Sequence, residues 1–203
     1  MRLTLSALPI VLLGCANTMS GTVEGERVGR ANESIFQLIS YDVPLVGTLT
    51  GVGIAITGAK DSCEGMDELD AVSHDCNDRC DELLVIADDH LPSDEIWTLW
   101  MWLLSDDAVE GHYLHSDESD FDGFGASIER ADVSSLRDYD ACVELCLEGD
   151  PYPTTTESST GGTIELTAYE SHETLEGEYS IEFGADLVEG HFAADWCEIF
   201  EIF

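Results

Sequence analysis

Three consecutive segments near the end of this sequence alternate apolar and polar residues with a period of two. These segments are 163–169, 175–183 and 187–196, and a three-residue connection that begins at Gly184 joins the last two. Side chains of a β-strand point alternately to opposite faces of a sheet, so this period is typical of strands that bury one face. Because the connections are short, neighbouring strands must run antiparallel. This part of the chain therefore predicts an antiparallel meander.

The preceding part of the chain also consists mainly of short apolar or alternating runs, which Gly, Asp, Ser and Pro separate. Runs of strand length occupy residues 22–28, 34–41, 49–57 and 83–87. Residues 96–104 are apolar on both faces and contain three tryptophans. A buried helix with Ser93 as its N-cap is one interpretation, but the aromatic content favours a central strand. We therefore expect a mainly β fold, either an antiparallel β-sandwich or an open barrel.

Two segments have helical rather than strand periodicity. Residues 62–81 carry apolar side chains at spacings of three to four, and residues 136–147 show the same pattern over a shorter length. Such spacings place the apolar side chains on one face of a helix. Residues 149–162 are rich in Gly, Pro, Ser and Thr, which is the composition of a linker. We expect one or two short helices and an internal linker within the β-rich domain.

The N-terminal segment that ends at Cys15 has a composition of its own. Arg2 precedes an apolar run over 3–13, and the segment closes with the sequence Leu-Leu-Gly-Cys. The run is shorter than the roughly 20 residues that a membrane-spanning helix needs. The segment resembles the signal of bacterial lipoproteins, in which the chain is cut before the cysteine and lipid is attached to it. This resemblance implies a signal peptide at 1–14 and lipidation of Cys15.

The same resemblance implies where the mature protein lies. Residues 15–21 form a short tether before the single β-rich domain expected at 22–203, so the domain should lie close to the lipid headgroups. Ala16 follows the lipidated cysteine and lacks the acidic side chain that is associated with retention at the inner membrane. We therefore expect a protein of the bacterial cell envelope that a lipid anchors to the outer membrane.

The strand-like segments carry a second, looser resemblance. Residues 162–167, 175–183 and 188–197 are similar to the closing meander of uncharacterised acidic secreted bacterial lipoproteins. The segment Gly-Thr-Val at 21–23 and the mid-chain Cys63 fit the same pattern. The resemblance implies a secreted β-rich domain. It implies no activity, because no activity is assigned to such proteins.

Six cysteines follow Cys15, and they are Cys63, Cys76, Cys80, Cys142, Cys146 and Cys197. An even number of cysteines in an exported chain is typical of disulfides. In two pairs the spacing of four residues places both sulfurs on one face of a helix. Two antiparallel helices could then be joined by Cys76–Cys146 and Cys80–Cys142 bridges, which leaves Cys63 to pair with Cys197. The alternative is a zinc site of four cysteines, although zinc ribbons more often use a shorter spacing.

Acidic residues dominate the charge of the chain. It contains 43 Asp and Glu against 7 Lys and Arg, and its net charge is −36. This charge repels phosphates, which argues against nucleic acid as a partner, and it attracts cations and basic proteins. Solubility alone would also account for it. Apolar residues make up 44% of the chain, so the sequence predicts a folded core rather than a disordered acidic tail.

One acidic segment matches the spacing of an EF-hand calcium loop. Glu118, Asp120, Asp122 and Glu129 would supply oxygen ligands at loop positions one, three, five and twelve, and Gly123 would make the turn. The first position is Glu rather than Asp, and no helix clearly precedes the loop. An acidic hairpin loop between Tyr113 and Ile128 is the interpretation that we prefer. We therefore expect no cofactor, with calcium as the alternative.

The sequence contains no recognised catalytic motif. The six histidines lack the H-E-x-x-H spacing of zinc proteases, and there is no Gly-x-Ser-x-Gly elbow, phosphate-binding loop or dinucleotide fingerprint. A carboxylate pair for glycoside hydrolysis could lie among the acids without any motif. We expect a lipid-anchored, non-catalytic structural or binding module of the cell envelope, with a secreted hydrolase as the alternative. A deep cleft with converging acids and aromatic residues would favour the hydrolase.

Overall fold

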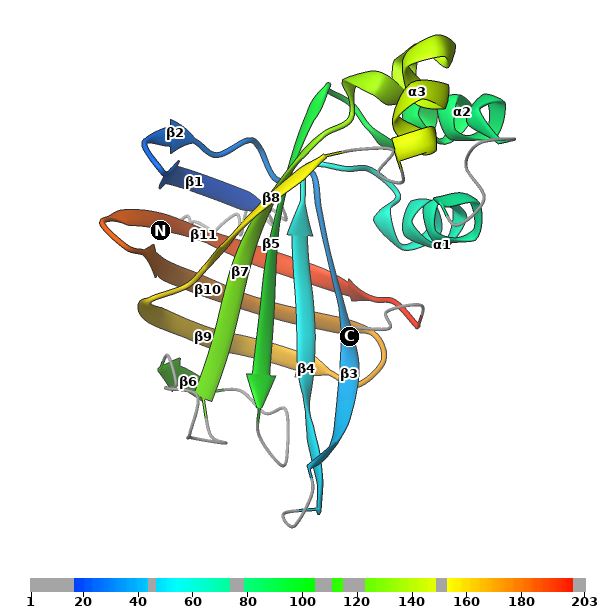
Figure 1. The fold of residues 1–203 in the computed structure, drawn as a ribbon. Coiled ribbons are helices and arrows are strands. Elements are labelled where there is room, and N and C mark those ends of the chain that lie inside the picture. Colours follow the sequence, from blue (N-terminus) through cyan, green and yellow to red (C-terminus); the bar gives the residue numbers. More distant parts are fainter. Residues whose placement is uncertain are drawn as a thin grey trace, which may run out of the picture.

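The computed structural model describes residues 17–43, 47–73, 79–104, 111–114, 123–148 and 153–198, and Figure 1 shows their arrangement. The strands are β1 (Thr18–Val23), β2 (Glu26–Arg27), β3 (Glu33–Val43), β4 (Gly47–Thr57), β5 (Glu95–Leu104), β6 (Gly111–Leu114), β7 (Gly123–Asp132), β8 (Thr154–Ser158), β9 (Gly161–Glu170), β10 (Thr174–Phe183) and β11 (Asp186–Trp196). The helices are α1 (Ser62–Ser73), α2 (Cys80–His90), α3 (Tyr139–Glu148) and the 3₁₀-helix η2 (Ser134–Arg137). The fold is therefore mainly β, as the sequence predicts. No helix in the described part of the chain is long and apolar enough to cross a membrane.

The strands form one curled sheet that stays open at its edges. Its order is β6-β9-β10-β11-β3-β4-β5-β7-β8, and β1 pairs with both β11 and β2. Neighbouring strands are antiparallel except β11 and β3, which run parallel where Asp195 and Trp196 face Ile35 and Phe36. Figure 1 shows β9, β10 and β11 crossing behind β3, β4, β5 and β7. The sheet therefore folds over on itself as a half-barrel, which confirms the predicted open-barrel architecture.

The main core lies on the inner face of the curled sheet, between these two layers. Alternation along β10 places Leu175, Tyr179 and Ile181 in this core, and Phe36 and Leu99 enter it from the opposite layer. All five side chains are buried. Burial of a large apolar side chain stabilises a fold by roughly 1.5–3 kcal/mol, so this core is the main source of stability. The antiparallel meander predicted for the last three strands is confirmed.

The helices lie together beside one end of β4, β5 and β7, at the upper right of Figure 1. Their buried side chains form a second cluster, which also includes Ile96 from the outer face of β5. The strand predicted over 83–87 is wrong, because this segment lies inside α2. Cys80, Leu83 and Ala87 are buried there at spacings of three and four residues. A short apolar run does not by itself distinguish a strand from a helix.

The two predicted helical segments are both present, but each is divided. The segment 62–81 contains α1 and the beginning of α2, and residues 74–78 lie outside the described residues. The segment 136–147 is divided between η2 and α3. Asp138 precedes α3, and its carboxylate accepts a hydrogen bond from the backbone N–H of Ala141 at 3.0 Å. This bond satisfies one of the free N–H groups of the first helical turn and fixes the start of α3.

Two of the predicted connections contain strands. β8 lies within the predicted linker 149–162, is exposed along its length and pairs with β7. Its three threonines favour a strand without apolar alternation, which is why composition alone suggested a linker. The predicted tether 15–21 overlaps β1, which pairs with β11. Before β1, the side-chain oxygen of Asn17 accepts hydrogen bonds from Ser34 Oγ at 2.8 Å and from the N–H of Ala193 at 2.9 Å. The folded domain therefore includes residues of the predicted tether.

Two of the predicted disulfides are present. Cys63 in α1 is bonded to Cys197 after β11, with 5.7 Å between their Cα atoms. Cys80 in α2 is bonded to Cys142 in α3, with 5.9 Å between their Cα atoms. The first bridge ties the helical layer to the end of the sheet, and the second ties two helices to each other.

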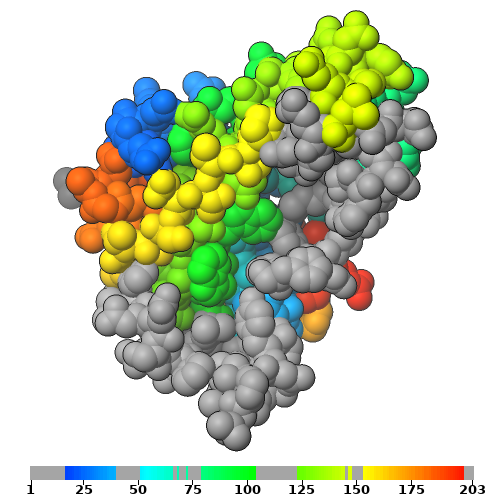
Figure 2. Space-filling view, viewed as in Figure 1, coloured from blue at the N-terminus to red at the C-terminus, as the bar shows by residue number. Residues whose placement is uncertain are grey.

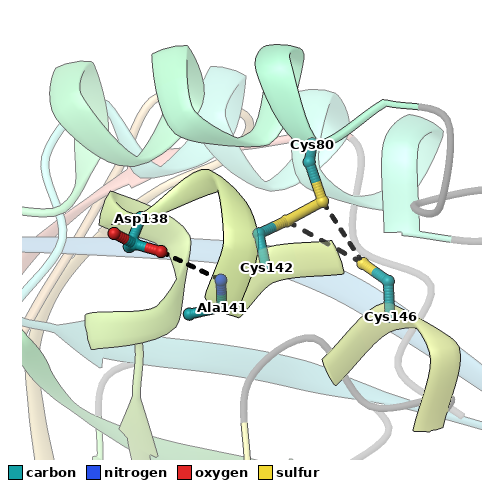
Figure 3. The surroundings of a disulfide bond; sticks show 5 residues. All are labelled: Cys80, Asp138, Ala141, Cys142 and Cys146. Carbon is teal, nitrogen blue, oxygen red and sulfur yellow. Dashed lines mark hydrogen bonds between the residues drawn. A yellow bond between two sulfur atoms is a disulfide. The ribbon is translucent and has the colours of Figure 1, made fainter. Parts of the chain in front are cut away.

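The sulfur of Cys146 lies beside the second bridge, 3.8 Å from that of Cys80 and 3.9 Å from that of Cys142 (Figure 3). Cys146 is itself disulfide-bonded, and its predicted partner Cys76 lies outside the described residues. Within the described part of the chain, this is the one group of three or more His, Cys, Asp or Glu side chains close enough to share a metal. Cysteine binds metals as a thiolate, so the bonded pair of Cys80 and Cys142 does not support the zinc alternative.

Candidate functional site

The outer face of β4, β5 and β7 carries a row of polar side chains. Strand pairing places Thr57 opposite Thr98 and Thr98 opposite Glu129. The adjacent residues Leu99 and Ile128 belong to the inner core. Because successive side chains of a strand point to opposite faces of the sheet, the row of Thr57, Thr98 and Glu129 faces outward. It crosses three neighbouring strands at the end of the sheet where the helices lie.

A cavity of about 170 Å³ lies between this row and the helical layer. Ser62 at the start of α1, Leu91 after α2, and Val133 and Leu136 at η2 contribute to its wall from the helical side. The described residues that line it are Ala55, Thr57, Ala59, Ser62, Leu91, Ile96, Thr98, Trp100, Glu129, Ala131, Val133 and Leu136. Figure 2 views this side of the molecule, where the yellow strand β8, which pairs with β7, runs diagonally towards the helical layer. The lining is mainly apolar, as in most small-molecule sites, and the volume suits one molecule of about the size of a benzene ring.

Among the described residues, Glu129 provides the one carboxyl group of the cavity lining. None of the ion pairs among the described residues includes it, and the adjacent Arg130 pairs with Glu26 instead. Burial raises the pKa of Glu129 above its ordinary value, and a hydrogen bond from the side chain of Trp100 opposes this rise. The cavity therefore contains a half-buried carboxyl group that has no cationic partner in the described structure.

Ser62 contributes a hydroxyl group to the same cavity. The residue is 2% exposed, and its Oγ has no hydrogen-bond partner among the described residues. Its backbone N–H donates to the carboxylate of Glu33 on β3, which fixes the start of α1 beside the sheet. The adjacent Cys63–Cys197 bridge holds the same end of the helix. A buried hydroxyl without a partner costs about 1–3 kcal/mol, and a polar ligand in the cavity would remove this cost.

Thr57 and Thr98 add a hydroxyl pair to the wall formed by the sheet. Their Oγ1 atoms are 2.9 Å apart, and Thr57 Oγ1 also accepts a hydrogen bond from the N–H of Ala59 at 3.2 Å. A threonine hydroxyl has one donor and two acceptor positions. The pair therefore keeps a free acceptor position on Thr98, next to Glu129.

A second, more polar cavity of about 110 Å³ lies near the β1–β2 turn. Its lining is Val23, Glu24, Glu26, Trp97, Ile128, Arg130, Thr155 and Glu157. Arg130 forms an ion pair with Glu26, and its guanidinium lies 5.8 Å from the centre of the Trp97 ring. Arg130, the one cation among the described residues of this lining, is thus already bound by the protein. The cavity between the sheet and the helical layer is the stronger candidate for a ligand site.

The structure does not position Glu129 for the predicted calcium loop. Glu118, Asp120 and Asp122 lie outside the described residues, as does Cys15. Glu129 lies six residues after Gly123 in the same extended strand, and at about 3.3 Å per residue the two are roughly 20 Å apart. In a calcium loop these two positions belong to a compact turn around one ion. Glu129 therefore belongs to the cavity, where it lies opposite Thr98.

The sequence alone did not identify Ser62, Thr57, Thr98 or Trp100 as site residues. One feature of the sequence does point to this region: the run 96–104 is apolar on both faces. Such a strand needs cover on both sides, and in this fold the outer cover is the helical layer and its cavity. Ser62 had no sequence signal, because its burial follows from the packing of α1 against the sheet.

Comparison of the chain with protein-family models, with curated proteins and with solved structures finds no match.

Proposed function

We propose that this protein is a lipid-anchored binding module of the bacterial cell envelope and that it acts without catalysing a reaction. The cavity between the sheet and the helical layer is its binding site. One observation carries the proposal: an apolar space is bordered by the carboxyl group of Glu129, which has no ion-pair partner, and by the buried, unpartnered hydroxyl of Ser62 among the described residues. Apolar pockets with a few converging polar groups are the usual form of small-molecule sites.

The same geometry gives less support to a hydrolase. Glycoside hydrolysis needs two carboxyl groups, and among the described residues the cavity lining contains only that of Glu129. A nucleophilic serine needs a base within hydrogen-bond reach, and Ser62 Oγ has no partner in the described residues. The groups of the cavity can bind and orient a ligand, but they do not form a pair arranged for acid–base or nucleophilic chemistry.

Export and anchoring are supported by the sequence around Cys15 and by the disulfides. Disulfides persist in the oxidising compartments that exported proteins reach, and the two bridges described above hold the helical layer in place. The hydrogen bonds of Asn17 to β3 and β11 leave only Ala16 between Cys15 and the folded domain. Such a connection reaches about 3.5 Å per residue, so the anchored domain would lie directly against the headgroups.

The charge of the chain supports the proposed class of partner. A net charge of −36 repels nucleic acid and raises the local concentration of cations and basic molecules around the domain. In the envelope, the partners are therefore the membrane, through the lipid, and a positively charged ligand or protein.

Substitution of Cys15 tests the anchor. We expect Cys15→Ser to release the protein from the membrane fraction of the native host, because the acyl chains that hold it cannot be attached. Ala16→Asp is the matched variant: it keeps the lipid and should move the protein from the outer-membrane to the inner-membrane fraction. Complete retention of the Cys15→Ser protein in the membrane fraction would contradict the proposed anchor.

A turnover assay separates the binding module from the hydrolase. A molecule that binds in the cavity should be recovered chemically unchanged after prolonged incubation with the protein, as mass spectrometry of the supernatant would show. Conversion that stops in Glu129→Gln would instead support the hydrolase.

A further inference from the structure

We infer that the cavity between the sheet and the helical layer binds a small organic cation, namely a primary ammonium group on a compact apolar body. This inference rests on the proposed function, since it names the ligand class of the same cavity. Four features of the described residues support it: the unpaired carboxyl group, the acceptor hydroxyls, the apolar wall and the limited volume.

The carboxyl group of Glu129 requires a positive partner when it is ionised. A charge that is removed from water costs several kcal/mol unless it is paired. The ion pairs of the described residues use Arg79, His90, Arg130 and Arg137, and none of these cations contacts Glu129. Since the protein supplies no cation at this carboxyl group in its described part, a ligand can supply one.

The hydroxyl groups of the cavity suit the hydrogen bonds of an ammonium group. An ammonium ion has three N–H donors and no acceptor. Glu129 and Thr98 are direct neighbours on adjacent strands, about 4.8 Å apart across the sheet, and both offer acceptor oxygens. Ser62 lines the same cavity from the helical layer, and its Oγ has no hydrogen-bond partner among the described residues, so it can also accept. Three acceptors from two sides of the cavity match three donors on one nitrogen.

The rest of the lining suits an apolar body. Ile96, Leu91, Val133 and Leu136 surround the space with aliphatic groups. Trp100 adds an aromatic ring, to which ammonium ions are attracted. A volume of about 170 Å³ accommodates a single substituted ring but not a peptide or a long polyamine. The ligand is therefore compact, with one charged end.

Other ligand classes fit this cavity less well. An anion would be repelled by Glu129 and by the net charge of the chain. A calcium ion takes 6–8 oxygen ligands, whereas the described part of the lining provides one carboxyl group and the hydroxyls of Thr57, Ser62 and Thr98. A neutral apolar molecule would fill the space but would leave the carboxylate desolvated and unpaired.

A pair of probes of nearly equal shape tests the inference. Benzylamine carries a positive charge at pH 7, and benzyl alcohol has the same ring and no charge. Titration calorimetry on the purified full-length domain should give benzylamine an affinity at least about tenfold higher than that of benzyl alcohol, a difference of about 1.4 kcal/mol. A change in tryptophan fluorescence on binding of either probe would show that the aromatic ring of the probe lies near Trp100.

Three variants test whether the preference for benzylamine over benzyl alcohol arises in the cavity. Glu129→Gln should remove the difference between the two probes, because it removes the charge and keeps the shape. Glu178→Gln removes the same charge from an exposed position on β10, and it should leave the preference intact. Ala131→Leu should weaken both probes, because it adds three methylene-sized groups to the cavity wall. Circular dichroism confirms that each variant is folded.

The outcomes separate this inference from the function on which it rests. If both probes bind with equal affinity and Ala131→Leu weakens both, the cavity binds small molecules but does not select a charged one. This result would overturn the inference of a cationic ligand and would leave the proposed binding module intact. Preference for benzylamine that survives Glu129→Gln would overturn the role of the carboxyl group. Failure of both probes to bind would overturn the inference as a whole, while the fractionation of Cys15→Ser would still test the anchored module.

Discussion

Glu129 and Ser62 each have a polar group in an environment that lowers the stability of the folded protein. One is a half-buried carboxyl group without a cation, and the other is a buried hydroxyl without a hydrogen-bond partner, both judged over the described residues. Each arrangement costs free energy of folding. Local departures of this kind are expected at functional sites, where a ligand supplies what the protein lacks. Both residues line one cavity, which is why we place the function there.

The stability of the protein should depend on pH through Glu129. Because burial raises the pKa of this group in the folded state, the folded protein holds the proton more tightly than the unfolded chain does. Ionisation therefore lowers stability, an effect absent at pH values below the ordinary pKa of 4.5 and fully present above the raised pKa. We expect Glu129→Gln to raise the melting temperature at pH 7 and to lose this advantage below pH 4.5.

The control for this measurement is Glu178→Gln, which reports the general effect of removing one of the 43 acids. The stabilisation by Glu129→Gln at pH 7 should exceed that of the control. Equal melting temperatures of the two variants across the pH range would contradict the environment assigned to Glu129.

Removal of the Ser62 hydroxyl in Ser62→Ala should raise the free energy of unfolding by up to about 1–3 kcal/mol, the cost of a buried hydroxyl without a partner. The reason is that its Oγ makes no hydrogen bond in the described structure. Ser34 provides the contrast, since it is equally buried but donates a hydrogen bond to Asn17 at 2.8 Å. Urea unfolding should show a loss of stability for Ser34→Ala only. A comparable loss in Ser62→Ala would mean that its hydroxyl has a partner.

At the scale of elements, the strands were more predictable than the helices. Alternation identified β9, β10 and β11 because each has one face in the core and one in solvent. The prediction of a strand over 83–87 is wrong because a run of five apolar residues fits a strand or a helix equally well. The helix α2 extends beyond this run on both sides, and its buried face also includes Cys80 and His90. β8 was missed because an exposed edge strand has no apolar period. The sequence pattern therefore predicts strands that bury one face in the core, and it does not predict an exposed strand such as β8.

The candidate site was less predictable than the fold. Of the four proposed calcium ligands, Glu129 alone lies among the described residues, and it lines a cavity rather than an ion loop. The cavity joins residues from β4, β5, β7, α1 and η2, which are distant in sequence. Their proximity depends on the register of three strands and on the position of α1, and neither can be read from local spacing.

Asp138 allows a test of the helical layer. Its carboxylate caps α3 through the N–H of Ala141, so Asp138→Ala should cost about 1 kcal/mol of stability. Asp140→Ala removes an exposed acid from the first turn of the same helix, and it should cost less because Asp140 does not cap the helix. Thermal unfolding of the two variants gives the comparison. An equal effect would show that charge, rather than the cap, stabilises this helix end.

At the scale of the whole molecule, charge should control stability in solution. Folding brings a net charge of −36 into a compact volume, so mutual repulsion is strongest at low ionic strength. The screening length falls from about 30 Å at 0.01 M salt to about 3 Å at 1 M. We expect the melting temperature to rise smoothly with sodium chloride, and micromolar calcium to add little. If the melting temperature rises sharply with calcium at fixed ionic strength and Glu129→Gln abolishes this rise, the result would support the calcium loop instead.

The intact mass of the protein purified from the bacterial envelope tests the central claim, that this is an exported and lipid-anchored domain. We expect a chain that lacks residues 1–14, carries acyl chains on Cys15 and has its six other cysteines oxidised. The disulfides of the described residues agree with that oxidation state. An unprocessed chain that retains Met1, or a chain without acyl mass and with free thiols, would contradict the claim.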